Sequence, residues 1–309
     1  MDMSDPAPRT VLDQIGKTAL LPLRRLGPRN GSRILLKLED GNPTGSIKDR
    51  MALAMIEAAE ADGRLQPGGR VVEYTGGSTG VSLALVCAVK GYHLDIVSSD
   101  AFAAEKLAHM RALGAEVHVI ASDDGRMTEK LTRDMIEAAR VITAENGGFW
   151  TDQLNNTDQL RAYHSMADEI FDQTNGELDA FVQIVGTAAS LRGIAEKLQK
   201  YDDSITVVAI EPAESAVLSG HPTGAHKIDG VGAGFVVPLW YDDVADVIEL
   251  VSTEEASAMA VRLAQEEGLF AGTSTGANVL VALRLAERLP PNSTIVTVMC
   301  DTGMKYLSK

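Results

Sequence analysis

Lys48 is the residue of this sequence whose position best suits covalent chemistry. It stands where a glycine-bearing turn, residues 41–47, gives way to a helical pattern, and the apolar run at 34–38 leads into that turn. The partial positive charge at a helix N-terminus disfavours a protonated amine, so a lysine placed there can supply the free amine that Schiff-base chemistry needs. Position alone favours the plainer interpretation, in which Lys48-Asp49-Arg50 is a solvated charge cluster.

Two turns rich in small and hydroxyl residues have the pattern of anion sites. Thr75-Gly76-Gly77-Ser78-Thr79-Gly80 and Gly186-Thr187-Ala188-Ala189-Ser190 each follow a strand-like run and open a helix. Backbone N–H groups exposed in such a turn, together with the helix dipole, favour an anion. Neither turn has the Gly-Lys-Ser ending of a P-loop or the GxGxxG spacing of a dinucleotide site. An ordinary tight turn between strand and helix is the alternative for both.

A third motif, Gly272-Thr273-Ser274-Thr275-Gly276, fits the GxSxG pattern of hydrolase nucleophiles. That mechanism needs an acid and then a histidine downstream, and the sequence has no histidine after His226. A serine hydrolase is therefore excluded. Ser274 remains a hydrogen-bond partner at a helix start, or simply an N-cap.

The elements that must position these motifs alternate between strand and helix. Strand-like runs occur at 34–38, 70–73, 94–98, 117–120, 180–184, 205–210, 247–251 and 293–299, and helical patterns occur at 81–89, 106–113, about 126–143, 160–171, 254–267 and 276–288. This rhythm predicts parallel sheets with helices on both faces, so a site should lie at the carboxyl ends of the strands. The glycine-rich stretch at 219–234 is too long for an ordinary connection and is a candidate site loop.

Composition narrows the class of protein. The 309 residues carry a formal net charge of −15, which argues against a nucleic-acid or anionic-membrane surface. We expect a cytoplasmic protein, because the N-terminus lacks the basic start and apolar core of a signal peptide and no apolar run approaches a membrane span. The histidines show no metal-ligand spacing, so no metal is expected. Cys87 and Cys300 lie in apolar surroundings and are interpreted as small core residues.

Taken in order, the motifs resemble the cysteine synthase (O-acetylserine sulfhydrylase) and cystathionine β-synthase family of pyridoxal-phosphate enzymes. The resemblance runs from about Ile15 to Ser308, and its most specific segments are 42–50 (NPTGSIKDR), 211–215 (EPAES) and 226–235 (HKIDGVGAGF). It implies an α/β fold of the tryptophan synthase β-like kind (PLP fold type II), with two open, twisted, mainly parallel sheets flanked by helices. It also implies a larger cofactor-binding domain, 1–41 and 146–309, and a smaller mobile domain, 42–145, that carries the substrate carboxylate loop.

The resemblance assigns a role to each motif. Lys48 would hold pyridoxal 5′-phosphate as an internal aldimine and then remove the substrate α-proton. Ser274 would hydrogen-bond the pyridine nitrogen, and Ser78 stands where the family has an asparagine that reaches the cofactor. The cofactor phosphate would lie on the run formed by Gly186, Thr187, Ala188, Ala189 and Ser190. The substrate side would be formed by Thr75, Gly76, Gly77, Thr79 and Gln153 at the α-carboxylate and by Gly230 on the nucleophile side.

The sequence departs from the family pattern in two loops. Family members usually have Thr-Ser-Gly-Asn-Thr-Gly at 75–80, so Gly76 lacks a hydroxyl and Ser78 is shorter than the asparagine it replaces. We expect the pocket near Gly76 to be roomier for that reason. The phosphate loop of the family normally reads Gly-Thr-Gly-Gly-Thr, and Ala188 and Ala189 replace its glycines, which constrains close backbone approach.

The implied activity is β-replacement on an O-activated L-serine, such as O-acetylserine or O-phosphoserine, through an aminoacrylate that takes up a small nucleophile. One alternative is β-elimination, as in serine or threonine dehydratases and cysteine desulfhydrases. Another is a catalytically weak paralogue that acts as a binding partner, suggested by Gly76 and Ser78. The family further implies a homodimer, with serine acetyltransferase as a candidate partner.

Overall fold

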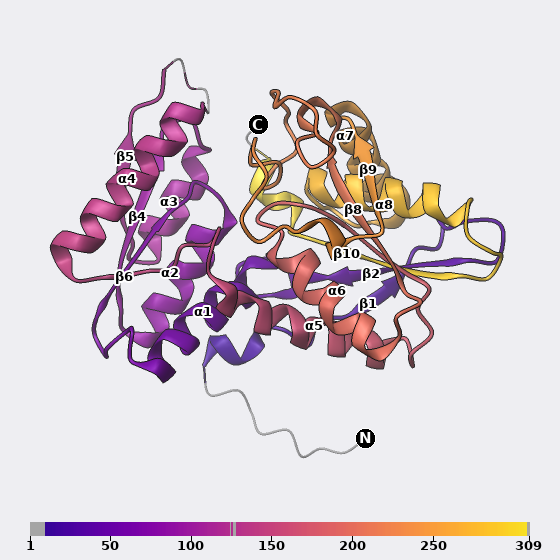
Figure 1. Cartoon of the computed structure of the whole chain (residues 1–309), viewed down its shortest axis with the longest axis horizontal. Helices are drawn as coiled ribbons and strands as arrows, with labels where there is room; N and C mark the ends of the chain where they lie inside the picture. Colours follow the sequence, from indigo (N-terminus) through magenta and orange to yellow (C-terminus); the bar gives the residue numbers. More distant parts are fainter. Residues whose placement is uncertain (1–9, 124, 126–127, 308–309) are drawn as a thin grey trace.

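A computed structural model describes residues 10–123, 125 and 128–307 and contains two sheets (Figure 1). The larger sheet has the order β1-β2-β10-β7-β8-β9, and the smaller has the order β5-β4-β3-β6. The strands of the larger sheet are β1 (Leu20–Pro22), β2 (Arg33–Leu38), β7 (Ala180–Ile184), β8 (Thr206–Pro212), β9 (Val247–Val251) and β10 (Thr294–Met299). Those of the smaller sheet are β3 (Arg70–Tyr74), β4 (His93–Ser99), β5 (Glu116–Ile120) and β6 (Phe149–Trp150). Only β1 pairs antiparallel among the described strands.

Helices cover both sheets, as the alternating pattern predicts. Figure 1 shows the smaller sheet with α2, α3 and α4 on one side of the molecule and the larger sheet with α5 to α8 on the other. The helices are α1 (Lys48–Asp62), α2 (Ser78–Lys90), α3 (Ala104–Ala112), α4 (Glu129–Asn146), α5 (Leu160–Gln173), α6 (Ala189–Tyr201), α7 (Thr253–Arg262), which continues as a π-helix (Leu263–Glu267), and α8 (Thr273–Ala286). None of the described helices combines the length and apolarity that a membrane crossing requires.

The predicted strands and helices are all present, and the prediction of two mainly parallel sheets is confirmed. Two strands escaped the sequence patterns, because β1 has three residues and β6 has two, which is too short for a periodicity. The smaller sheet therefore extends past residue 145, since β6 pairs with β3. The expected start of a helix at Arg126 lies outside the described residues, and α4 begins at Glu129.

Burial explains why the central strands are continuous apolar runs. Every residue of β7 and of β10 is buried, as expected for parallel strands covered on both faces. Strand β10 lies between β2 and β7, so the loops after these three neighbouring strands meet at one edge of the larger sheet. That edge is where a site is expected.

Candidate active site

Lys48 lies at this edge, beside the end of β10. The turn after β2 is held against β10 by a hydrogen bond from Ile47 N to Cys300 O (2.9 Å) and by an antiparallel bridge between Ser46 and Asp301. Helix α1 then begins at Lys48 itself. The lysine is therefore fixed at a strand end rather than displayed on a solvated face, which contradicts the surface-charge interpretation.

The surroundings of Lys48 favour its neutral form. Burial lowers the pKa of its ammonium, and the nearby Cys300 and Asp301 oppose that shift only in part. The carboxylate of the next residue, Asp49, accepts hydrogen bonds from other residues. Its Oδ2 accepts from Thr44 N (2.7 Å), and its Oδ1 accepts from Ser82 Oγ (2.6 Å). Lys48 is thus a half-buried amine that deprotonates more readily than an exposed lysine.

Ser274 approaches the same point from the first turn of α8. It is 3% exposed, and a hydrogen bond joins its hydroxyl to the Cys300 thiol. Cys300 N also donates to Thr275 Oγ1 (3.1 Å), so the start of α8 is fixed to the end of β10. The structure therefore brings both Ser274 and Lys48 close to Cys300.

The interpretation of Cys300 as a core residue is only partly right, because its side chain packs against the main hydrophobic cluster but also interacts with Lys48. Cys300 is only partly buried and interacts with both Lys48 and Ser274, whereas Cys87 is buried as predicted. Burial raises the pKa of the Cys300 thiol to about 11, so it is a neutral thiol at physiological pH. A signal was present in the sequence, because Cys300 directly follows an apolar strand and precedes Asp301, at the edge where sites form.

The loop at 186–190 has the features of a phosphate site. No described side chain caps the first turn of α6, so its N–H groups are available to an anion. A Cβ added to Gly186 would lie 2.8 Å from Gly230 O, which places the phosphate loop directly against the glycine-rich loop at 219–234. Ala188 adopts φ +67°, a conformation that glycine occupies more readily and that marks strained functional turns.

These contacts fit pyridoxal phosphate. They offer a helix N-terminus for its phosphate, an amine of lowered pKa for its aldehyde and a buried hydroxyl for a ring atom. Lys48, Ser274 and the loop at 186–190 follow or precede the neighbouring strands β2, β10 and β7. Each was named from the sequence as part of one cofactor site, and their roles stay predictions.

The second loop, 75–79, lies at the carboxyl end of β3 in the smaller sheet. Thr79 Oγ1 donates to Gln153 Oε1 (2.8 Å), and Gln153 Nε2 donates to Tyr74 O (3.2 Å). The two elements meet because β6, which precedes Gln153, pairs with β3. No described side chain caps the first turn of α2, which leaves its N–H groups for a carboxylate.

Glu73 joins these two segments and was not identified from the sequence. It is fully buried, and its carboxylate accepts from Tyr74 N (2.9 Å), Thr151 Oγ1 (2.7 Å) and Gln153 N (3.0 Å). Burial raises the pKa of Glu73 to about 7, although these three donors oppose the shift. A buried acid in a strand gives no sequence signal beyond its position two residues before Thr75.

We predict that amino-acid binding weakens as the pH falls through about 7. Protonated Glu73 is a poorer acceptor for the N–H of Gln153, and losing a hydrogen bond to a charged group corresponds to about tenfold in affinity. The pH dependence of this affinity is measured as the apparent Kd for L-serine between pH 6 and pH 8, determined from the visible absorbance of the bound cofactor. The difference between the wild type and Glu73→Gln isolates the contribution of this carboxyl from the titration of the amino acid; a pH dependence unchanged in the variant contradicts the prediction.

The expectation of a roomier pocket at Gly76 is wrong. A Cβ added to Gly76 would lie 1.8 Å from Cγ of Phe102, so the aromatic ring already fills the space of the missing side chain. Phe102 follows β4, which is the other neighbour of β3 in the smaller sheet. The loop at 75–79 is therefore flanked by Gln153 on one side and by Phe102 on the other.

Ser78 has a partner from the end of the chain. Lys305, in the 3-10 turn Gly303–Tyr306, lies with Nζ 3.3 Å from Ser78 Oγ. Burial lowers the pKa of Lys305, while Asp301 and Asp49 oppose the shift. The turn that follows β10 thus contacts the loop of the smaller sheet, so both sheets contribute to one site.

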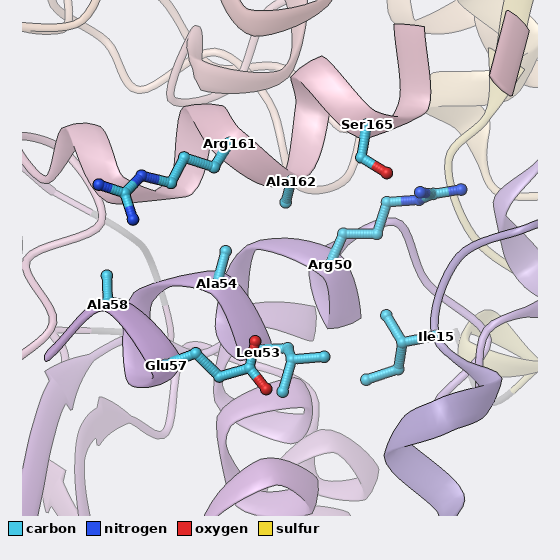
Figure 2. A pocket seen from close by; sticks show the side chains of 9 residues that line it. All are labelled: Ile15, Arg50, Leu53, Ala54, Glu57, Ala58, Arg161, Ala162 and Ser165. Atoms are coloured by element: carbon cyan, nitrogen blue, oxygen red, sulfur yellow. The ribbon is translucent and has the colours of Figure 1, made fainter. Parts of the chain in front are cut away.

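Two other features lie apart from this site. Figure 2 shows a cavity of about 310 Å³ between α1 and α5, lined by Ile15, Arg50, Leu53, Ala54, Glu57, Ala58, Arg161, Ala162 and Ser165. Neither Lys48 nor either anion-binding loop lines it. The neighbouring strands β4 and β5 place His118 Nε2 2.8 Å from Asp95 Oδ1, with Glu116 nearby, although Arg70 already pairs with the same aspartate.

This chain is similar to known proteins over nearly its whole length. The family model described as pyridoxal-phosphate dependent enzyme matches residues 11–301. The probable cysteine synthase of Bacillus subtilis (strain 168) is 40% identical over 299 residues, which cover 96% of this chain and 95% of that relative. A solved cysteine synthase from Entamoeba histolytica has a TM-score of 0.92 at 35% identity, covering 100% of this chain and 93% of that one. A solved O-ureido-L-serine synthase has a TM-score of 0.92 at 34% identity, covering 98% and 95%.

Proposed function

The chain belongs to the pyridoxal-phosphate dependent enzymes, and from this premise we propose that it catalyses β-replacement on an O-activated L-serine, as a cysteine synthase does. Its fold is the tryptophan synthase β-like fold, and its cofactor is pyridoxal phosphate. The observation that carries the proposal is that an amine of lowered pKa, Lys48, occurs together with a loop whose uncapped helix start offers N–H groups to a carboxylate.

The residues at the larger sheet hold the cofactor. Lys48 Nζ would bind it covalently, the N–H groups of 186–190 would bind its phosphate, and Ser274 Oγ would meet its ring nitrogen. When bound, the cofactor withdraws electrons from the α-carbon of an attached amino acid. Ser274 would limit this withdrawal, because a neutral hydroxyl, unlike a carboxylate, leaves the ring less electron-withdrawing, which favours loss of a β-substituent.

Lys48 then serves as the base. When its amine is free, Lys48 can accept the α-proton at Nζ, and burial favours this neutral form because it lowers the pKa of the ammonium. The N–H groups of Thr75 to Thr79 and the Gln153 side chain would orient the α-carboxylate. Orientation of the carboxylate fixes which bond at the α-carbon faces Lys48.

We also propose that the smaller domain, residues 42–145 together with β6, closes over the substrate and that the enzyme acts as a homodimer. The contact between Ser78 and Lys305 supports closure, because it joins the substrate loop to the end of the larger domain. Gly230 lies against the phosphate loop at Gly186, where it would line the side from which the nucleophile enters.

The test mixes the purified yellow protein with O-acetylserine or O-phosphoserine and follows its visible spectrum. We expect a donor-dependent spectral change that sulfide reverses, with L-cysteine as the product. Pyruvate release that does not depend on a nucleophile would favour β-elimination instead. A spectrum that no amino acid changes would favour the catalytically weak paralogue.

A further inference from the structure

Gly76 and Phe102 occupy one position of the substrate loop between them. An ideal Cβ on Gly76 would lie 1.8, 1.9 and 2.3 Å from Cγ, Cδ2 and Cδ1 of Phe102, which are distances no real Cβ tolerates. Gly76 does not have a positive φ, so its backbone would accept a side chain if the ring were absent. The glycine at this position is therefore required by the ring and not by the turn.

The backbone beneath Phe102 is fixed. Phe102 N donates to Ser99 O (3.2 Å) in a turn, and Ala101 N donates to Ser99 Oγ (3.2 Å). Asp100 Oδ1, in the same turn, accepts from Ser122 N (2.8 Å) after β5. The ring itself packs against the hydrophobic cluster of the smaller sheet, so it cannot withdraw from Gly76 without losing buried contacts.

We infer that Phe102 is a positioning residue that shapes the carboxylate loop, and that Phe102 and Gly76 together determine how tightly the amino-acid substrate is bound. The inference rests on the proposed function, in which the loop at 75–79 binds the α-carboxylate. Gly76 is buried under the ring, so the loop backbone is held by apolar packing on this side and by the Thr79–Gln153 hydrogen bond on the other.

Packing of this kind acts on binding more than on the chemical step. The loop offers backbone N–H groups, whose hydrogen bonds to a carboxylate depend steeply on alignment. A ring that excludes water from the loop also strengthens those bonds, because the local dielectric constant falls. Phe102 has no group that could transfer a proton, so its effect should appear in KM and Kd rather than in kcat.

The experiment is a double-mutant cycle on the cofactor-loaded enzyme with Gly76→Ser, Phe102→Ala and the double variant. We expect each single variant to raise the KM for the O-activated serine by about tenfold. Gly76→Ser does so because the new side chain clashes with the Phe102 ring, and Phe102→Ala does so because the loop loses its packing. In the double variant the new side chain occupies the space of the ring, so KM should recover to within about threefold of the wild type. The values of kcat should change less than KM throughout.

Val141→Ala, which trims an exposed side chain on α4 of the same domain, is the control for general destabilisation. The Kd of L-serine, from the cofactor spectrum, gives a readout that does not require turnover. If the KM changes multiply in the double variant, or if Phe102→Ala leaves KM and Kd unchanged, the inference is overturned. If Gly76→Ser does not fold, recovery of folding in the double variant supports the pairing, and failure of both overturns it. A wild-type protein that no amino acid affects would instead refute the proposed function.

Discussion

Lys48→Ala should reduce β-replacement at least about 1,000-fold, because it removes both the covalent attachment of the cofactor and the base. The variant should still retain pyridoxal phosphate, since the phosphate loop at 186–190 does not depend on the lysine. Its bound cofactor should absorb as free aldehyde rather than as the lysine-bound form. The visible spectrum and the rate of cysteine formation measure the two effects separately.

The matched control is Lys200→Ala, at an exposed position in the last turn of α6. It removes the same side chain from the same type of element and should leave the spectrum and the rate unchanged. The unfolding midpoint of the cofactor-free Lys48→Ala protein should not fall, because burial already disfavours the charged lysine. An unaltered lysine-bound spectrum in Lys48→Ala would show that Lys48 is not the residue that binds the cofactor covalently.

The order of strands and helices was predictable because the strands of a parallel sheet have strong apolar patterns in the sequence. Strands such as β7 and β10 are buried on both faces and therefore appear as apolar runs, and helix spacing separates them. Since sites in such sheets form where strands end, the position of Lys48 after β2 and that of Ser274 at the start of α8 already pointed to one edge. The meeting of Thr79 with Gln153 followed from the family resemblance and not from spacing.

What the sequence did not reveal depends on contacts between distant segments. Gly76 alone predicts empty space, and only the turn after β4 shows that Phe102 fills it. Lys305 gives no signal of its contact with Ser78, because 227 residues separate them. A glycine in place of a larger residue therefore predicts the shape of a pocket only when the residues that pack against the glycine are known.

Arg50→Met should destabilise the protein by about 3–5 kcal/mol, because it leaves the buried Glu39 carboxylate without its cation and removes one of the two cations from Glu169. Arg50 donates to Glu39 through Nε (2.7 Å) and to Glu169 through Nη1 (2.8 Å), and Lys37 Nζ also lies 2.7 Å from Glu169 Oε2. Glu39 and Lys37 are fully buried. Urea unfolding of the cofactor-free protein measures the change.

The matched control is Arg64→Met, which removes the same side chain from another pair of carboxylates. Arg64 contacts Asp62 and Asp158 at 2.6 Å each, but 42% of its side chain is exposed, so the loss should stay within about 1 kcal/mol. Equal losses in the two variants would contradict the argument from burial. The network also joins the end of β2 to α1 and α5, so Arg50→Met should weaken cofactor retention at Lys48, two residues away.

The same network predicts how stability depends on pH. Burial alone would raise the pKa of Glu169, but its hydrogen bonds and ion pairs to Arg50 and Lys37 outweigh burial and hold that pKa at about 2. A carboxyl whose pKa is lowered on folding stabilises the protein above its unfolded pKa of about 4.3, and that stabilisation is lost as the pH falls toward 2. The difference in unfolding free energy between the wild type and Glu169→Gln should therefore be constant above about pH 5 and shrink below pH 4.3. A difference that stays constant down to pH 3 would mean that Glu169 contributes shape rather than charge to the segment that presents Lys48.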